Sequence, residues 1–536
     1  MSQNILILNL NTGHDIATSA YLIGAIKTEK PQASVEILVD KKHEGVARIL
    51  SGVSAVHTID TEMIQTIYDN PLYSNAFAVN EFTSSIKDIS EKEWSHIVNY
   101  SNDDISSYLI SSINAENKVG TSITVNGAAK CSDVWSIYQN HVASKQTRLP
   151  IDKVTIRNHM MNLPVQNDYL KVKHDENYSV VAGQNFRRIR EMKGSAGTFV
   201  VGISLEQSQN GHSFDMETYT EIIEALEESD DYKAVLLLNG KNYQRSIANE
   251  LNKNFNNSLI SINIDIAALT SVVSNLDAIV STSNETLAIA DLMETKCIEV
   301  KDANATHQAP YAMNQGSYTI FQKDTRPLAS DVLLALNEEF GTELPISCMQ
   351  SDNQVYKSIN DEYGQLYTQI RGSLDVQAEL RYHLGRSYFF ETLGYPRNNE
   401  LLKHIHENTD KEQLMHFVSS LRSELTSTVK LLLATLRSLK GVKNSEGNLN
   451  TFIGYLDNLI SVGKQDSLTG DIIRNFEGKI ENIETNDIDT NIKSIEDYLF
   501  ALKTDLQILT GYLGDLVQPS TTEDTTSVQG QQETQS

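Results

Sequence analysis

A chain of 536 residues is too long for a single hydrophobic core, and its length predicts about three or four domains. The formal net charge of -26 argues against unspecific binding to nucleic acid or to an anionic lipid surface, because both carry the same sign of charge. No apolar stretch approaches the roughly 20 residues of a membrane span and no signal peptide is visible. We therefore expect a cytoplasmic protein without integral membrane contact.

The three cysteines, Cys131, Cys297 and Cys348, lie far apart in the sequence. They lack the close pairs that are typical of zinc sites and disulfide frameworks. We expect them to be reduced and structural, and no other cluster of residues has the spacing of a metal site.

The first part of the chain alternates short apolar segments with helical patterns. Ile5 to Leu10 is an aliphatic run typical of a strand buried on both faces of a parallel sheet, and Asn11 to Gly13 break it. Further strands are expected at 35–39, 54–60 and 96–99, with helices after Asp15, at 44–50 and after the last of these strands. Repeated units of this kind predict a doubly wound parallel sheet.

Asp15 is expected at the carboxyl end of the first strand, just before a helix. Open α/β sheets bind ligands at this edge, so the carboxylate is a candidate functional group. The alternative is that Asp15 only caps the helix, a role for which aspartate is favoured.

A polar stretch at 171–197 separates this first part from a second one, and it carries four cations, Arg187, Arg188, Arg190 and Lys193. These cations either line a cleft between two domains or form a solvated helix face. Beyond them, strands are expected at 198–205, 233–240, 278–283 and 296–300, and helices at 216–228, 243–253, 264–276 and 285–293. The pattern predicts a second α/β domain that the strand at 296–300 closes.

From about Gln354 onwards the pattern is helical only, with long amphipathic segments. Their apolar stripes could pack internally, form a homo-oligomer or dock a protein partner. The residues after Val517 are almost all polar and are expected to be disordered. The predicted organisation is 1–185 and 186–345 for the two α/β domains, 350–516 for the helical bundle and 517–536 for the tail.

Over roughly residues 1–330 the chain resembles glycosyltransferase family 9, the heptosyltransferases, whose GT-B fold sets two Rossmann-like domains across a cleft. The stretch "LNTGHD", Leu10 to Asp15, matches the family turn that carries the catalytic aspartate, with His14 in place of the usual glycine. The resemblance implies that Asp15 is the general base that takes the proton of the acceptor hydroxyl. His14 would assist Asp15 or contact a donor phosphate, or it is a hydrogen-bonded structural residue.

A second match is the turn Ser283, Asn284, Glu285, Thr286, which resembles the phosphate-binding turn of the family. The resemblance implies that these residues offer hydroxyl and amide hydrogens to a diphosphate at a helix amino terminus. Glu285 would oppose an anion if it points into the site, and Ala288 replaces the expected histidine. The alternative is an ordinary helix-capping sequence.

Two weaker matches complete the donor side. In "NGHSFDMETYTEII" His212 stands at the basic position of the family motif, and Phe214 and Tyr219 stand at its aromatic positions. His212 would bind a phosphate oxygen, whereas the two aromatic residues are equally consistent with helix packing. The residues that match the family's glycine-bearing turn beside the nucleotide are Asn239, Gly240 and Lys241.

Together these matches imply an inverting, metal-independent glycosyltransferase without a cofactor. It would move a sugar from a nucleotide-sugar to a hydroxyl of a protein or glycan acceptor, and ADP-heptose is one candidate donor. The altered motifs leave a second interpretation, a catalytically weakened GT-B relative that serves in binding or assembly. A third, a nucleotide-sugar epimerase, has no motif of its own. Transfer to the lipopolysaccharide core rests on analogy alone.

Overall fold

The computed structural model describes residues 3–73, 75–146, 148–165, 171–173, 176–194, 197–208, 213–282, 285–302, 313–323, 328–346, 351–372, 374–442, 446–483 and 487–517. Two compact units are present, Met1–Leu374 and Asp375–Ser536. No helix in the described ranges combines the length and the apolarity that a membrane crossing requires.

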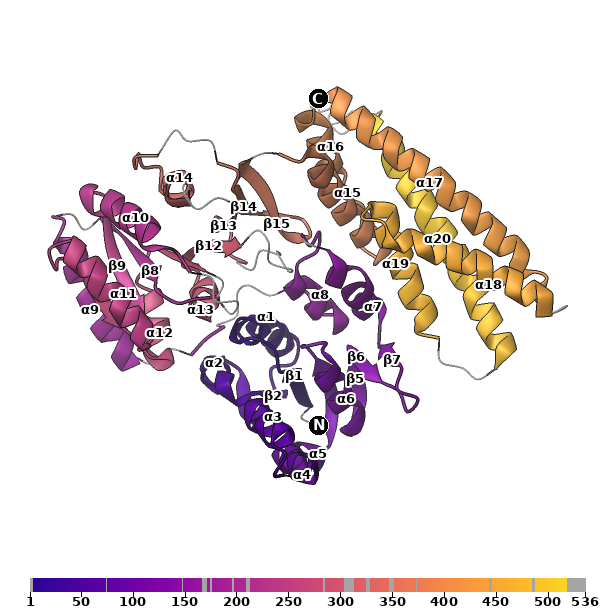
Figure 1. Ribbon diagram of the computed structural model, residues 1–536, viewed down its shortest axis with the longest axis horizontal. Helices are drawn as coiled ribbons and strands as arrows, with labels where there is room; N and C mark the ends of the chain where they lie inside the picture. Colours follow the sequence, from indigo (N-terminus) through magenta and orange to yellow (C-terminus); the bar gives the residue numbers. More distant parts are fainter. Residues whose placement is uncertain are drawn as a thin grey trace, which may run out of the picture. The chain divides into compact units, whose positions relative to one another are not determined.

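The amino-terminal part of the first unit is built on a parallel five-stranded sheet with the order β3-β2-β1-β4-β5 (Figure 1). Its strands are β1 (Asn4–Asn9), β2 (Ser34–Asp40), β3 (Val53–Ile59), β4 (Trp94–Asn99) and β5 (Ala115–Val119). Its helices are η1 (Lys41–His43), α1 (Gly13–Glu29), α2 (Glu44–Ile49), α3 (Thr61–Asp69), α4 (Asn75–Ser85), α5 (Lys87–Ser90), α6 (Asp104–Ser112), α7 (Val134–His141), η2 (Ala143–Lys145) and α8 (Lys153–Met160). A small antiparallel pair, β6 (Thr121–Ile123) and β7 (Ala129–Cys131), follows β5.

The second part of this unit carries an eight-stranded sheet with the order β10-β9-β8-β11-β12-β13-β14-β15. Its strands are β8 (Phe199–Ser204), β9 (Tyr232–Leu238), β10 (Ile260–Asn263), β11 (Ala278–Thr282), β12 (Lys296–Asp302), β13 (Tyr318–Gln322), β14 (Gln354–Asp361) and β15 (Gly364–Arg371). Its helices are α9 (Glu176–Glu191), α10 (Met216–Glu228), α11 (Asn242–Asn254), α12 (Ile266–Val273), α13 (Glu285–Leu292) and α14 (Leu328–Phe340). The six parallel strands from β10 to β13 have the strand order of a dinucleotide-binding domain.

Both sheets are covered on each face by apolar side chains. Ile5, Ile7 and Val35 pack with α1 on one face of the first sheet, while Leu6 and Leu8 pack on the other. The second sheet has the same two-sided core. Continuous apolar runs such as Ile5–Leu8 are therefore explained by burial on both faces. The predicted α/β class with two Rossmann-like domains is confirmed.

Two expectations for the end of the first unit are wrong. The strand at 296–300 does not close the second sheet, because β13 adds to it in parallel and the β14–β15 hairpin adds in antiparallel fashion. The helical bundle consequently does not begin at residue 350, and the division between the units falls after Leu374.

The predicted boundary between residues 185 and 186 falls inside α9, which packs on β8 and α12 of the second sheet.

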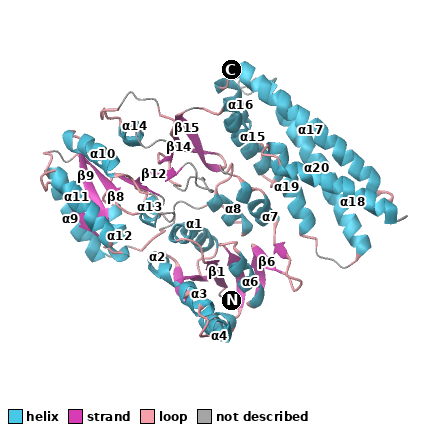
Figure 2. Cartoon of the chain, viewed as in Figure 1, coloured by secondary structure: helices cyan, strands magenta, loops and turns pink. Residues whose placement is uncertain are grey.

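The second unit is helical throughout its described residues, as the sequence predicts (Figure 2). Its helices are α15 (Val376–Thr392), α16 (Asn399–Asn408), α17 (Lys411–Leu439), α18 (Glu446–Ser461), η4 (Val462–Lys464), α19 (Leu468–Glu481) and α20 (Ile488–Val517). The long helix α17 packs on α18 and α20, and it buries Leu421, Leu425 and Leu432. The predicted tail lies outside the described residues.

Candidate functional site

The first turn of α1 places Asp15 and His14 at the carboxyl edge of the first sheet. Thr12 is the residue that caps this helix, since its hydroxyl accepts a hydrogen bond from the Asp15 backbone N–H at 3.1 Å. The Asn9 amide group supports the turn by donating to the Asp15 carbonyl at 2.9 Å and to the Ser19 hydroxyl at 2.8 Å. Because Thr12 is the cap, the Asp15 carboxylate is available for other contacts.

The Asp15 carboxylate pairs with Arg157, which α8 supplies. Arg157 Nη1 lies 3.0 Å from Asp15 Oδ1, and the guanidinium also lies over the Tyr100 ring, 4.1 Å from its centroid. Burial by itself raises the pKa of the Asp15 carboxyl, but the positive charges of Arg157 and Lys153 outweigh it and lower the pKa to about 2. Asp15 is therefore a carboxylate at neutral pH and, in this arrangement, a weak base.

Charged groups from the second domain reach the same place. Burial lowers the pKa of His14 to about 4, against the opposing charges of Glu299 and Asp15. Glu299 and Lys301 come from β12, where Lys301 Nζ lies 3.4 Å from Glu299 Oε1. Burial also lowers the pKa of Lys301 to about 8. The negative charges of Glu299 and Asp15 oppose this shift, and the positive charge of Lys153 adds to it.

This polar cluster joins groups that the sequence analysis did not select, namely Lys153, Arg157, Glu299 and Lys301. Lys153 and Arg157 lie one helical turn apart on α8. The strand "KCIEVKD" mixes charged residues with Cys297, Ile298 and Val300, and within it Glu299 is fully buried. Two charges in the middle of a central strand were the signal that could have found this site.

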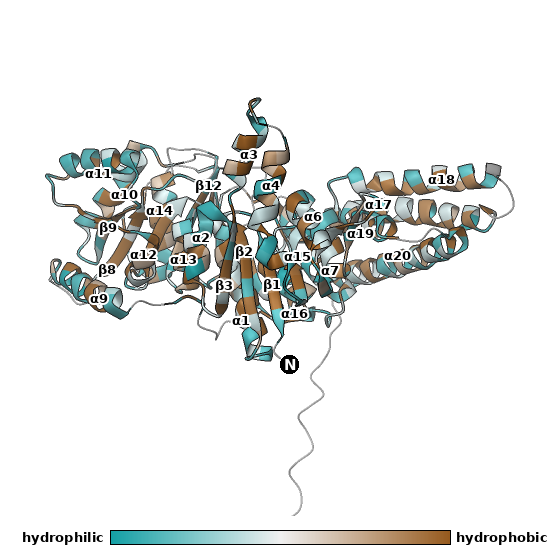
Figure 3. Ribbon diagram, turned by 90° about the horizontal axis from the view of Figure 1, so that it is seen from below, coloured by the Kyte–Doolittle hydropathy of each residue, from teal (hydrophilic) through white to brown (hydrophobic). Residues whose placement is uncertain are grey.

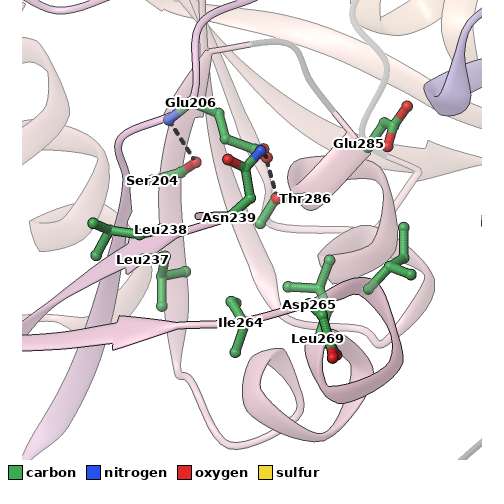
Figure 4. Close-up of a pocket in the computed structure, with 11 residues that line it drawn as sticks. Ser204, Glu206, Leu237, Leu238, Asn239, Ile264, Asp265, Leu269, Glu285 and Thr286 are labelled. Atoms are coloured by element: carbon green, nitrogen blue, oxygen red, sulfur yellow. Dashed lines mark hydrogen bonds between the residues drawn. The ribbon is translucent and has the colours of Figure 1, made fainter. Parts of the chain in front are cut away.

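The second domain has a pocket of about 290 Å³ at the carboxyl edge of its own sheet (Figure 4). Loop residues after β8 and β9 and the first residues of α12 and α13 surround it. The lining residues are Ser204, Glu206, Leu237, Leu238, Asn239, Ile264, Asp265, Ile266, Leu269, Glu285 and Thr286. One wall of the pocket is thus apolar, and the other carries carboxylate, amide and hydroxyl groups.

Glu206 organises the polar wall of this pocket. The Thr286 hydroxyl donates to Glu206 Oε2 at 2.6 Å, and the Asn239 amide donates to Oε1 (Figure 4). Burial raises the pKa of the Glu206 carboxyl above its ordinary value, and the hydrogen bonds from Thr286 and Asn239 offset this only in part. The sequence analysis missed Glu206, although it follows a buried strand in the same way as Asp15.

The predicted donor residues have different outcomes. Asn239, Glu285 and Thr286 line the pocket, whereas Gly240 and Lys241 are not among its lining residues. Gly240 has φ +89°, a conformation that favours glycine. The positive charge of Lys241 lowers the pKa of the Glu206 carboxyl, against the effect of burial. The predicted residues His212, Ser283 and Asn284 lie outside the described residues, as does Cys348.

Glu285 does not point toward Glu206. Figure 4 shows its carboxylate turned away from the polar wall, and Glu285 Oε1 lies 2.6 Å from Nδ1 of His43, which belongs to the first domain. The carboxylate also lies against Gly13, where a Cβ would come within 2.1 Å of Oε1. The expected opposition of Glu285 to a bound anion is thus reduced by its contact with the first domain.

The remaining candidates are not among the residues that line the pocket. Phe214 and Tyr219 are buried and form an edge-to-face ring pair at 5.1 Å, so they pack α10 on its sheet. Within the basic run, Arg190 binds Asp277 at 2.6 Å and Lys193 binds backbone carbonyls. Arg187 and Arg188 are exposed on α9. None of these cations is among the residues that line the pocket.

Cys131 and Cys297 are buried, and the Cys131 sulfur accepts a hydrogen bond from the Asn140 amide. No group of three or more His, Cys, Asp or Glu side chains in the described ranges could hold a metal ion.

No protein-family model matches the chain, and no curated protein matches it significantly. Similar solved structures include a family 9 glycosyl transferase from Veillonella parvula, with 11% identity, a TM-score of 0.45, and coverage of 62% of this chain and 91% of that one. The E. coli heptosyltransferase WaaC with ADP has 11% identity, a TM-score of 0.45, and coverage of 63% and 100%. Anabaena HepE in complex with UDP and glucose has 13% identity, a TM-score of 0.33, and coverage of 63% and 91%. At this level of identity the likeness concerns the fold alone.

Proposed function

We propose that this chain is a glycosyltransferase that moves a sugar from a nucleotide-sugar to a hydroxyl of a protein or glycan acceptor. The observation that carries the proposal is the placement of two sites at carboxyl edges of parallel sheets. One is the polar cluster around Asp15, and the other is the pocket around Glu206. Two edges of this kind, one per domain, suit a two-substrate reaction.

The pocket would take the nucleoside of the donor. Leu237, Ile264 and Leu269 offer an apolar surface to a base, and the Glu206 carboxylate can accept hydrogen bonds from ribose hydroxyls. The diphosphate would lie at the amino terminus of α13, where Thr286 stands and where the resemblance places Ser283 and Asn284.

The cluster around Asp15 would carry the chemistry. The acceptor oxygen forms its bond to the anomeric carbon while the bond from that carbon to the diphosphate oxygen breaks, and a single displacement inverts the configuration. Asp15 takes the hydroxyl proton, and the nucleoside diphosphate leaves with the electron pair. The buried cations Lys301 and Arg157 would stabilise the negative charge of the leaving group without a metal.

The base function requires that Arg157 release Asp15. The guanidinium holds the pKa of Asp15 low, and a base with so low a pKa has little driving force to accept a proton. A donor diphosphate would compete with Asp15 for Arg157, because Arg binds phosphate in the same two-donor geometry as carboxylate. Donor binding would then raise the pKa of Asp15 at the moment when the base is needed.

The second candidate is a catalytically weakened relative that binds a nucleotide-sugar without transferring it. The Asp15–Arg157 ion pair favours this candidate, since a permanently paired Asp15 is only structural.

One experiment separates the two candidates. Full-length protein is incubated with a panel of ADP- and UDP-linked sugars, ADP-heptose among them, with cell extract as the acceptor source, and products are identified by mass spectrometry. Glycosyltransfer that is lost in Asp15→Asn and kept in Glu217→Gln, an exposed first-turn carboxylate on α10, supports transfer. Donor binding without turnover in the unmodified protein supports the weakened relative, and absence of both overturns the proposal.

A further inference from the structure

The helix pair α3–α4 and the turn between its helices carry exposed apolar side chains over the face of the first sheet that holds Leu6 and Leu8. These side chains are Met63, Tyr68, Leu72, Tyr73, Phe77 and Val79. Their exposed fractions run from 44% for Met63 to 89% for Leu72. Figure 3 shows brown, hydrophobic ribbon over α3 and α4 where they stand out beside the strands. We call this set the α3–α4 surface.

The domain core does not use these side chains. Helix α3 has no buried residue, and α4 buries Ala78 alone. The pair is anchored from its other side, where Ile64 and Phe82 pack against the core that contains Leu8 and Ile97. The packing of Ile64 and Phe82 thus holds the pair in place, while the side chains of the α3–α4 surface remain exposed.

The composition of this surface is that of the centre of a protein interface. Interface centres are enriched in Tyr, Phe and Met and poor in charge, and exposed apolar patches mark contact sites. Tyr73 and Phe77 are already arranged, with ring centroids 5.7 Å apart and an interplanar angle of 70°. Aromatic side chains that are fixed before binding lose little entropy when a partner covers them.

The charges around the surface indicate the partner. From residue 61 to residue 86 the sequence has no Lys or Arg, whereas Glu62 and Asp69 are exposed next to the apolar side chains. A second copy of this chain would bring the same acids and a net charge of -26, and an anionic lipid surface would also be repelled. A partner segment that carries both apolar residues and Lys or Arg would complement the exposed apolar side chains and the acidic residues beside them.

We propose that the α3–α4 surface binds a basic amphipathic helix of a partner protein. The apolar face of that helix covers Leu72 and Phe77, and its cations lie against Glu62 and Asp69. This inference does not depend on the proposed glycosyl transfer, because it rests on exposure and charge outside both sites.

The test uses a fluorescent helical peptide of Leu and Lys, with a Leu and Glu peptide as charge control, and the full chain as receptor. Fluorescence anisotropy should show that Leu72→Ser/Phe77→Ser weakens binding of the Leu and Lys peptide roughly tenfold or more. Glu62→Gln/Asp69→Asn should weaken it less, and this second loss should shrink as salt is raised. The matched controls are Val180→Ser/Val181→Ser on α9 and Glu224→Gln/Glu228→Gln on α10, all at exposed positions, and neither should change the affinity.

Because Leu72 and Phe77 are exposed, their replacement should leave the fold intact, and circular dichroism checks this. Equal loss in the control variants would show that the acidic chain attracts the peptide everywhere, and would overturn the proposal. It would also be overturned by equal binding of the Leu and Glu peptide, by binding to neutral vesicles that requires Leu72, or by a dimer in sedimentation that requires Leu72.

Discussion

His43 Nδ1 lies 2.6 Å from Glu285 Oε1, and this hydrogen bond joins two residues that are 242 positions apart in the sequence. His43 belongs to η1 of the first sheet domain, and Glu285 is the first residue of α13 in the second. The same carboxylate lies against Gly13, at the start of α1. Glu285 thus lines the pocket around Glu206 and at the same time contacts two residues of the first sheet domain, His43 and Gly13.

The close approach of Glu285 to Gly13 predicts how a substitution of Gly13 changes stability. In a helix, Gly→Ala ordinarily stabilises by about 0.5–1 kcal/mol, but at Gly13 the new methyl group would overlap Glu285. We expect Gly13→Ala to bring none of that gain and to lower the free energy of unfolding by at most about 1 kcal/mol, because the flexible end of Glu285 must swing aside and lose its hydrogen bond to His43. Urea unfolding measures this change.

A double-mutant cycle tests the stated cause. When Glu285 is already alanine, Gly13→Ala should show the ordinary helix stabilisation instead of a loss. Gly183→Ala on α9 is the control, since its nearest contact would be at 3.9 Å, and it should stabilise. A loss for Gly13→Ala that persists in the Glu285→Ala background would contradict the prediction.

The Asp15–Arg157 pair predicts a specific dependence of stability on pH. The folded pKa of Asp15 is about 2, below its ordinary 3.8, so the pair contributes its stability above pH ~4 and loses it as the pH falls toward 2. The contribution is about 2 kcal/mol by linkage. The difference in unfolding free energy between the unmodified protein and Asp15→Asn should therefore be largest near neutral pH and shrink below pH ~4.

A second variant distinguishes a buried pair from a general loss of packing. Asp15→Asn alone leaves the Arg157 charge buried without its carboxylate, which costs roughly 3–5 kcal/mol. Asp15→Asn/Arg157→Met should be less destabilised than Asp15→Asn. If the double variant is the less stable one, the pair does not act as described.

The sequence predicted four of the five parallel strands of the first sheet and four of the six of the second, because strands buried on both faces leave continuous apolar runs, such as Ile5–Leu8. The parallel strands β5, β10 and β13 were not predicted. The sequence also did not predict β14 and β15. Their residues alternate more weakly, with partly exposed Lys357 between buried Tyr356 and Ser358 and partly exposed Ile359 beside exposed Asn360. The amphipathic pattern of the following helices dominated the interpretation. In the sequence, the glycine at position 364 was the available signal for a hairpin, and in the structure Gly364 has φ +108° at the start of β15.

The candidate site was predicted only where a motif follows a strand. Asp15, Asn239 and Thr286 were selected in this way. Arg157 was not, because its partner Asp15 is 142 positions away and no local pattern records that pairing. The orientation of Glu285 likewise depends on His43 and Gly13, which a different strand and loop supply.

His14 predicts a second pH effect in a different range. Its folded pKa is about 4 and its ordinary value is 6.5, so burial of the neutral imidazole contributes stability that is present above pH ~6.5 and is lost as the pH falls toward 4. His14→Gln should therefore flatten the fall in melting temperature between pH 6.5 and 4. His416→Gln, at an exposed position on α17, should leave that fall unchanged. An equal effect of the two variants would show that His14 is not the group responsible.

Glu206 provides the sharpest test of the donor pocket. As a carboxylate it accepts from Asn239 and Thr286 and can accept further from ribose hydroxyls, whereas a glutamine at this position offers one acceptor oxygen and a competing amide. We expect Glu206→Gln to weaken binding of ADP or UDP roughly tenfold, measured by isothermal titration calorimetry.

The matched control for Glu206 is Asp230→Asn, which changes an exposed acid outside the pocket and should leave the affinity unchanged. Electrostatics alone predicts the opposite direction for Glu206→Gln, since removal of a negative charge should favour a diphosphate. Weaker binding in Glu206→Gln therefore requires a hydrogen-bonding role for the carboxylate. Tighter binding would mean that Glu206 faces the phosphates and that the nucleoside does not occupy this pocket as proposed.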